Sequence, residues 1–135
     1  MDHKQYSRRI RHLLSAPFIF VTVIPLVILD IFIEIYQNVV FRLYMLPLVK
    51  RSDYIKIDRH KLEYLNFLQK IFCTYCGYAN GLLHYSCVIA GTTEKYWCGI
   101  RHQESPGFVP PPHHKDFLAY GDKAGFDSIK KKKCR

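Results

Sequence analysis

Hydrophobic residues gather in one long block near the N-terminus, and the pattern changes within it. Leu13–Leu29 contains 17 consecutive residues without a charged side chain. From there polar side chains return at every fourth position: Asp30, Glu34, Asn38 and Arg42. At about 100° per residue these positions share one face of a helix, and apolar residues fill the rest. Residues 13–49 are therefore predicted to form membrane-embedded apolar and amphipathic helices.

The block is compatible with two topologies. A transmembrane helix needs about 20 apolar residues, so residues 13–33 could cross the bilayer once. Alternatively, the chain bends near Pro25 and returns as a helical hairpin, or stays on one membrane face. Basic residues flank both ends of the block, so the positive-inside rule favours the hairpin or the one-sided arrangement. A buried hairpin in a soluble protein is disfavoured, because so small a core could not cover this much apolar surface.

Cysteine spacing after the block indicates a metal site. Cys73 and Cys76 form a C-x2-C pair followed by Gly77, and Cys98 and His102 form C-x3-H. A CxxC followed by glycine is typical of a zinc knuckle, in which a tight turn directs two thiolates at one ion. Together the four residues predict a closed Cys3His site, which favours a structural ion. Zinc is the expected metal; iron, or a redox dithiol at the CxxC, is the alternative.

The segments beside the cysteines are predicted to be helical. Asp58 is a candidate N-cap for a helix over 59–72, and Asn80 for a second helix over 81–95. Residues 50–102 would then be a helical metal-binding module. Aromatic side chains near the ligands would shape its surface: Tyr75, Tyr78 and Trp97.

Prolines and lysines dominate residues 103–135, which we expect to be an extended C-terminal tail. His113, His114 and Asp116 are a second, less favoured set of metal ligands, since adjacent histidines in a proline-rich loop rarely bind one ion. Cys87 is expected in the core of the second helix, and no role is predicted for Cys134.

The motif FCTYCGYANGL…EKYWCGIRH, with VKRSDYIKIDRHKLEYLN upstream, resembles a family of small bacterial proteins described only as uncharacterised membrane proteins. The resemblance covers roughly residues 13–102. It implies a bacterial cell-envelope setting and brings no activity with it.

Charge and cysteine count limit the choice of partner and compartment. The 135-residue chain has a formal net charge of +9. Its basic residues form three clusters: one in the N-terminal segment 1–12, a second just after the apolar block, and a third at Lys130–Lys133. Because the first two clusters flank the apolar block, they favour anionic lipid headgroups over nucleic acid as the binding partner. Five cysteines do not suit a paired disulfide scaffold, so we expect the metal module on the cytoplasmic side of the bacterial inner membrane.

These features predict a mainly α protein: a hairpin or single transmembrane helix, a small helical zinc-binding module and an extended tail. The sequence contains no phosphate-binding glycine loop, nucleophile elbow or HExxH, so no catalytic residue is predicted. We expect a membrane-attached zinc-binding protein of structural or adaptor type, which docks on a protein partner in a larger membrane assembly. The alternative is a redox or electron-transfer protein that uses iron or the CxxC dithiol at the same site.

Overall fold

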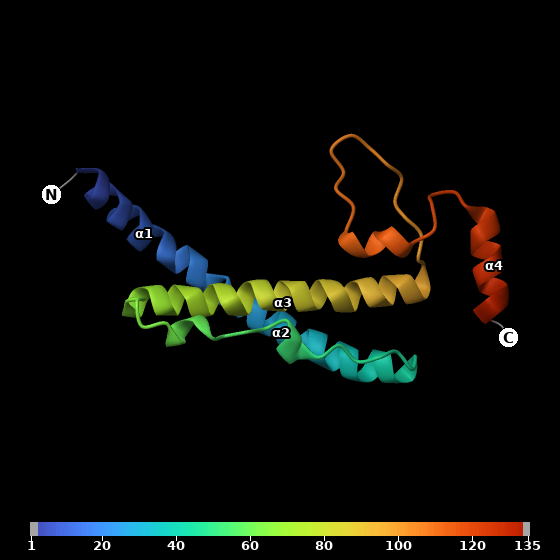
Figure 1. Cartoon of the computed structure of the whole chain (residues 1–135), viewed down its shortest axis with the longest axis horizontal. Coiled ribbons are helices and arrows are strands. Elements are labelled where there is room, and N and C mark those ends of the chain that lie inside the picture. The colour runs from blue at the N-terminus through green and yellow to red at the C-terminus, as the bar shows by residue number, and fades with distance from the viewer. Residues whose placement is uncertain (1–2, 134–135) are drawn as a thin grey trace. The chain divides into compact units, whose positions relative to one another are not determined.

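The computed structural model describes residues 3–133, and the side chains of residues 10–130 (Figure 1). Cys134 lies outside these residues. The long elements are α1 (His3–Val21), α2 (Val23–Tyr36), α3 (Phe67–Trp97) and α4 (Lys123–Lys133). A π-helical turn (Gln37–Phe41) extends α2, and three 3-10 turns span Arg51–Asp53, Arg59–Lys61 and Pro112–Asp116. Among the described residues the only β pairing is an isolated bridge, which confirms the prediction of a mainly α fold.

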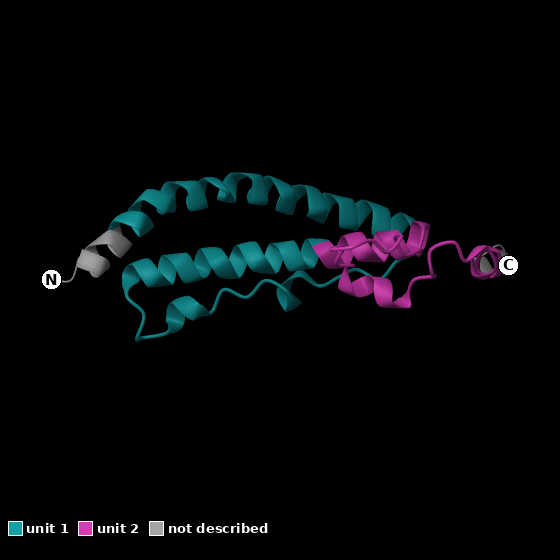
Figure 2. Cartoon of the chain, turned by 90° about the horizontal axis from the view of Figure 1, so that it is seen from above, with its two compact units in different colours: residues 1–86 teal, residues 87–135 magenta. Residues whose placement is uncertain are grey.

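The chain divides into two compact units, coloured separately in Figure 2. Unit 1 comprises residues 1–86 and unit 2 residues 87–135. The boundary falls inside α3, so this helix contributes its first part to unit 1 and its last part to unit 2.

In unit 1, α1 and α2 form nearly one helix. Thr22 separates them, yet the backbone N–H of Leu26 still donates to the carbonyl of Thr22 at 3.3 Å. The predicted bend at Pro25 is therefore wrong: this proline lies in the first turn of α2, where a missing N–H disturbs the helix little. Ile10–Phe41, 32 residues, is long and apolar enough to cross a membrane, and we call it the long helix.

The polar face of the long helix is satisfied within unit 1. Asp30 accepts a hydrogen bond from Tyr78 at 2.9 Å and pairs with Arg51 at 2.6 Å. Glu34 accepts a hydrogen bond from the buried Tyr85 at 2.9 Å. Gln37, also buried, donates to the Tyr85 hydroxyl at 2.8 Å. Two of the four periodic polar positions, Asp30 and Glu34, thus mark the surface against which α3 packs, whereas Asn38 and Arg42 are exposed.

The long helix and α3 run in the same direction. Phe20 stacks on Phe72 with ring centroids 5.5 Å apart, and farther along both helices Glu34 meets Tyr85. Residues 46–66, which we call the return segment, must therefore run back along both helices before α3 begins.

The structure has one helix where two were predicted over 59–72 and 81–95. Asn66 caps α3: its side-chain oxygen accepts a hydrogen bond from the backbone N–H of Gln69 at 2.9 Å. In return, the side-chain oxygen of Gln69 accepts a hydrogen bond from the backbone N–H of Asn66 at 3.0 Å. Asn80 is not a cap, since its side chain donates to the carbonyl of Cys76 inside the helix. Gly81 allows close packing, because a Cβ there would lie 2.7 Å from the carbonyl oxygen of Tyr54.

Unit 2 folds the polypeptide after α3 back on itself. The backbone N–H of Leu118 donates to the carbonyl of Gly99 at 2.8 Å, and the N–H of Arg101 donates to the carbonyl of Leu118 at 2.8 Å. The C-terminal segment is less extended than predicted, because Lys123–Lys133 form the helix α4. Asp122 caps this helix: its side chain accepts a hydrogen bond from the backbone N–H of Gly125 at 2.9 Å.

Candidate metal centre

Three potential metal ligands converge in unit 2: Glu94, His102 and His114. One ligand atom from each lies within 4.8 Å of the others. Glu94 belongs to the last turns of α3, His102 to the loop that follows, and His114 to the 3-10 turn Pro112–Asp116. Two imidazoles and one carboxylate suit a transition-metal ion such as Zn²⁺ or Fe²⁺.

Glu94 organises both adjacent histidines. Nε2 of His113 lies 2.8 Å from one carboxylate oxygen, and Nε2 of His114 lies 3.1 Å from the other. Since a carboxylate only accepts hydrogen bonds, both Nε2 atoms carry the proton. The hydrogen bond from His113 is the main cause that lowers the pKa of Glu94 below its ordinary value, against an opposing effect of burial.

His114 has a buried nitrogen without a partner. The side chain is only 3% exposed, and its ring stacks on Phe117 with centroids 4.8 Å apart. With Nε2 protonated toward Glu94, Nδ1 of a neutral imidazole holds a lone pair, and this atom has no hydrogen-bond partner. An unpaired buried acceptor is costly. An ion shared by Glu94 and His114 would bind Nε2 in place of its proton, because Nδ1 points away from the carboxylate.

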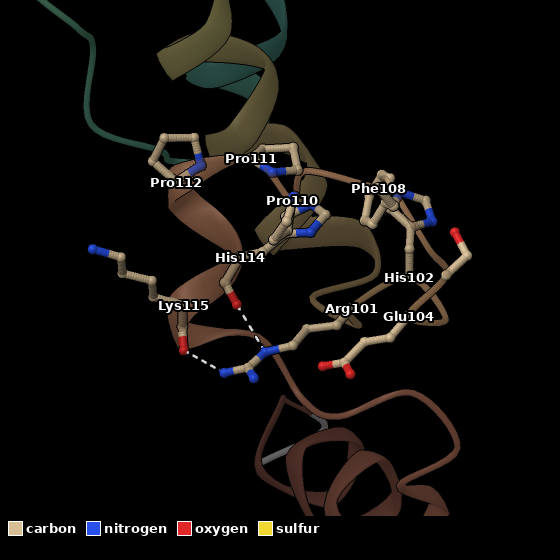
Figure 3. Close-up of a pocket in the computed structure, with 10 residues that line it drawn as sticks. Arg101, His102, Glu104, Phe108, Pro110, Pro111, Pro112, His114 and Lys115 are labelled. Atoms are coloured by element: carbon tan, nitrogen blue, oxygen red, sulfur yellow. Dashed lines mark hydrogen bonds between the residues drawn. The ribbon is translucent and has the colours of Figure 1, made fainter.

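Two contacts fix the 3-10 turn that presents His114. Arg101 donates from Nε to the carbonyl of His114 at 3.0 Å and from Nη2 to the carbonyl of Lys115 at 2.7 Å, as the dashed lines in Figure 3 show. His113 packs directly on α3 at Gly91, where a Cβ would lie 2.8 Å from its ring. The glycine therefore lets the turn approach the helix.

A cavity of about 580 Å³ adjoins the cluster. The side chains of His102 and Phe108 lie on one side of it, and three consecutive prolines lie above (Figure 3). Both His102 and His114 line this cavity, so a ligand that entered it would reach two of the three convergent groups.

The predicted Cys3His ligands are divided between the two units. Cys73 is half-buried and Cys76 exposed, both within α3 in unit 1, whereas Cys98 and His102 belong to unit 2. Because residues 73–78 are helical, the knuckle turn that we expected does not form. Among the described residues His102 is grouped with Glu94 and His114, not with a cysteine. The four-ligand set stays a prediction.

Other predicted site residues have different surroundings. Tyr75 hydrogen-bonds Thr22 and Tyr78 hydrogen-bonds Asp30, so both tyrosines serve the packing of unit 1. Cys87, expected in the core, is exposed. Of the less favoured set, His113 and His114 reach Glu94, while Asp116 lies 3.9 Å from Lys95.

Sequence reasoning missed Glu94. A weak signal was present: Glu94, Cys98 and His102 follow one another at intervals of four residues. This spacing places Glu94 and Cys98 one helical turn apart, and the backbone N–H of Cys98 donates to the carbonyl of Glu94 at 2.8 Å. The contribution of His114 depends on the fold of the chain after α3, which has no local signature.

Comparison with known proteins adds no family or function. No family model matches the chain, and no curated protein or solved structure matches it. The resemblance to small bacterial membrane proteins therefore stays a prediction, and function must be argued from the chain's own residues.

Proposed function

We propose that this protein is a membrane-attached, metal-binding protein of structural or adaptor type, which holds zinc in unit 2 and docks on a larger membrane-associated assembly. The convergence of Glu94, His102 and His114 within 4.8 Å carries the proposal. The buried His114 supports it, because its Nε2 lies 3.1 Å from a Glu94 carboxylate oxygen, where one ion could bind both groups in place of the hydrogen bond.

A structural zinc ion usually has four protein ligands. Cys98 is our candidate for the fourth: it is exposed and follows Glu94 by one helical turn. The proposed site thus keeps two of the ligands predicted from the sequence, Cys98 and His102. It replaces Cys73 and Cys76 by Glu94 and His114.

Metal analysis of the purified full-length protein tests this site. We expect about one zinc per chain in the wild type and loss of that zinc in His114→Ala. His60→Ala is the matched control, since His60 is exposed in unit 1 and should leave the zinc in place. Cys76→Ser separates the two ligand sets: full zinc content in this variant supports our site, whereas loss would show that the Cys3His set is correct.

A second candidate function is redox chemistry with iron at the same residues. Two histidines and one carboxylate with open positions are the ligand set of many non-haem Fe²⁺ sites, which favours this alternative if Cys98 does not bind. Cobalt substitution distinguishes the two cases. A thiolate-to-cobalt absorption band that disappears in Cys98→Ser supports the closed zinc site, and a native protein that contains iron would overturn the zinc assignment.

Attachment to the membrane is proposed from the long helix, and the basic clusters favour anionic headgroups as its lipid partner. We further propose the bacterial inner membrane, with the metal module on the cytoplasmic side. Affinity purification from native membranes, with His114→Ala in parallel, tests the adaptor role. A partner that is recovered with the wild type and lost with the variant supports docking through unit 2; equal recovery contradicts it.

A further inference from the structure

The long helix has two dissimilar faces. Asp30, Glu34 and Gln37 point into unit 1, toward α3 and the return segment. The opposite side is a stripe of exposed apolar side chains, which we call the apolar stripe: Leu13, Leu14, Phe18, Val21, Ile24, Ile28, Ile31, Phe32, Ile35 and Val39. At 100° per residue these positions are centred far from Asp30 and Gln37 around the helix. The apolar stripe therefore faces away from the rest of unit 1.

The return segment lies beside the part of the long helix that a transmembrane arrangement would place in lipid. Its residue Lys56 approaches α3 at Gly77, where a Cβ would lie 2.9 Å from the Lys56 carbonyl oxygen. Since α3 is parallel to the long helix and Phe72 meets Phe20, the residues between Lys56 and α3 lie level with the charge-free run 13–29. Together with Lys56, four of them are charged and exposed: Asp58, Arg59, Lys61 and Glu63.

Crossing the bilayer would bring this segment into the hydrocarbon. Charged side chains are strongly unfavourable there. Apart from two short 3-10 turns the return segment is also irregular, and lipid-exposed irregular backbone does not occur at membrane depth. The long helix can therefore cross the membrane only if it separates from α3 and loses the contacts of Asp30 and Glu34.

We infer that the long helix lies in the plane of the membrane interface, with its apolar stripe in the acyl chains of one leaflet and the return segment toward water. An amphipathic helix with one polar face binds membranes in this way. Basic residues stand at both ends, Arg11 before the apolar stripe and Arg42 after it, where they meet anionic headgroups. Anionic lipid is a better occupant than a second copy of the chain, because two chains of charge +9 repel each other.

The inference rests on the membrane-attachment part of the proposed function and is independent of the metal. Its test measures the depth of tryptophans placed along the apolar stripe, in a Trp97→Phe background that removes the single native tryptophan. Leu13→Trp, Ile24→Trp and Ile35→Trp are spaced by eleven residues, about 16 Å along the axis, and differ by only about 20° around it. Each variant is bound to phosphatidylcholine–phosphatidylglycerol vesicles that carry a quencher at a shallow or a deep acyl position.

An in-plane helix gives the same shallow depth at all three positions, with stronger quenching by the shallow label. Leu83→Trp, on an exposed position of α3, is the control and should escape quenching. A helix that crosses would place the Ile24→Trp indole deepest, and this result would overturn the inference.

Two further measurements separate the possible failures. Sedimentation with the vesicles reports membrane attachment itself, so binding with a crossing depth profile rejects the orientation alone. Absence of binding, together with a cross-linked dimer, would assign the apolar stripe to a second copy and reject both proposals about the membrane. Zinc content and helical circular dichroism of each variant confirm that the protein stays folded.

Discussion

Tyr85 is the buried phenol that ties α3 to the long helix, and Tyr85→Phe tests that packing. Its hydroxyl donates to Glu34 at 2.9 Å and accepts from Gln37 at 2.8 Å, while the side chain is fully buried. Phenylalanine keeps the ring and its contact with Tyr54, whose centroid is 5.9 Å away. The substitution therefore removes two hydrogen bonds and little else.

The expected loss follows from the partners. A neutral hydrogen bond contributes about 0.5–1.5 kcal/mol, and one to a charged group about 1.5–3 kcal/mol. Gln37 retains a bond to the carbonyl of Val49 at 3.2 Å, and Glu34 retains Arg51 at 3.6 Å, which reduces the loss. We expect the free energy of unfolding to fall by about 2–3 kcal/mol, equivalent to a decrease in Tm of roughly 10–20 °C for a unit of this size.

The assay is thermal and urea unfolding of the full chain in mild detergent, followed by circular dichroism. Tyr64→Phe is the matched control: Tyr64 is 80% exposed, and its substitution should change stability by no more than about 0.5 kcal/mol. If Tyr85→Phe proves as stable as Tyr64→Phe, the long helix does not pack on α3 through this contact.

Two other predictions concern the packing of α3 in unit 1. Burial, with a smaller contribution from the hydrogen bond to Glu34, raises the pKa of Tyr85 to about 12. The folded protein thus favours the protonated phenol. This stabilisation is complete below the unfolded pKa of about 10 and is lost as the pH rises through about 12. A pH series of unfolding curves should show the loss in the wild type and a smaller one in Tyr85→Phe; parallel curves would contradict the assignment. Gly81→Ala should destabilise by about 1–3 kcal/mol despite the better helix propensity of alanine, because the new methyl group meets the backbone of Tyr54 at 2.7 Å. A gain in stability, measured by the same unfolding assay, would show that the return segment is not held against α3.

The hydrophobic pattern predicted apolar helices here and a polar face from Asp30 onward, but not that Ile10–Phe41 is one helix. The positions of Asp30 and Glu34 indicated a packed surface, and the structure supplies its partners from α3 and the return segment. The expected knuckle turn at the CxxC motif and the expected N-cap at Asn80 were both inferred from local sequence alone. The structure continues α3 through both, and the missing side chain of Gly81 admits the backbone of Tyr54.

The candidate metal centre was predicted only in part. His102 follows a cysteine at ligand spacing, so the sequence drew attention to it. Glu94 and His114 are 20 residues apart and meet only because the loop after α3 folds back, held by Arg101 and the close contact at Gly91. Such tertiary proximity leaves no periodicity to detect. The CxxC motif, by contrast, has a strong local signature, and the structure places it inside a helix.

The long sequence separation between the long helix and its partner α3 also determines the order of events during synthesis. Glu34 and Tyr85 are separated by 51 residues, so at about 5–20 residues per second the partner of Glu34 leaves the ribosome several seconds later. During that interval the long helix exists without α3. In the in-plane arrangement that we infer, its apolar stripe would bind lipid first, and α3 would then dock along the membrane surface. A nascent chain released before Tyr85 would bind the membrane with Asp30 and Glu34 still without their α3 partners.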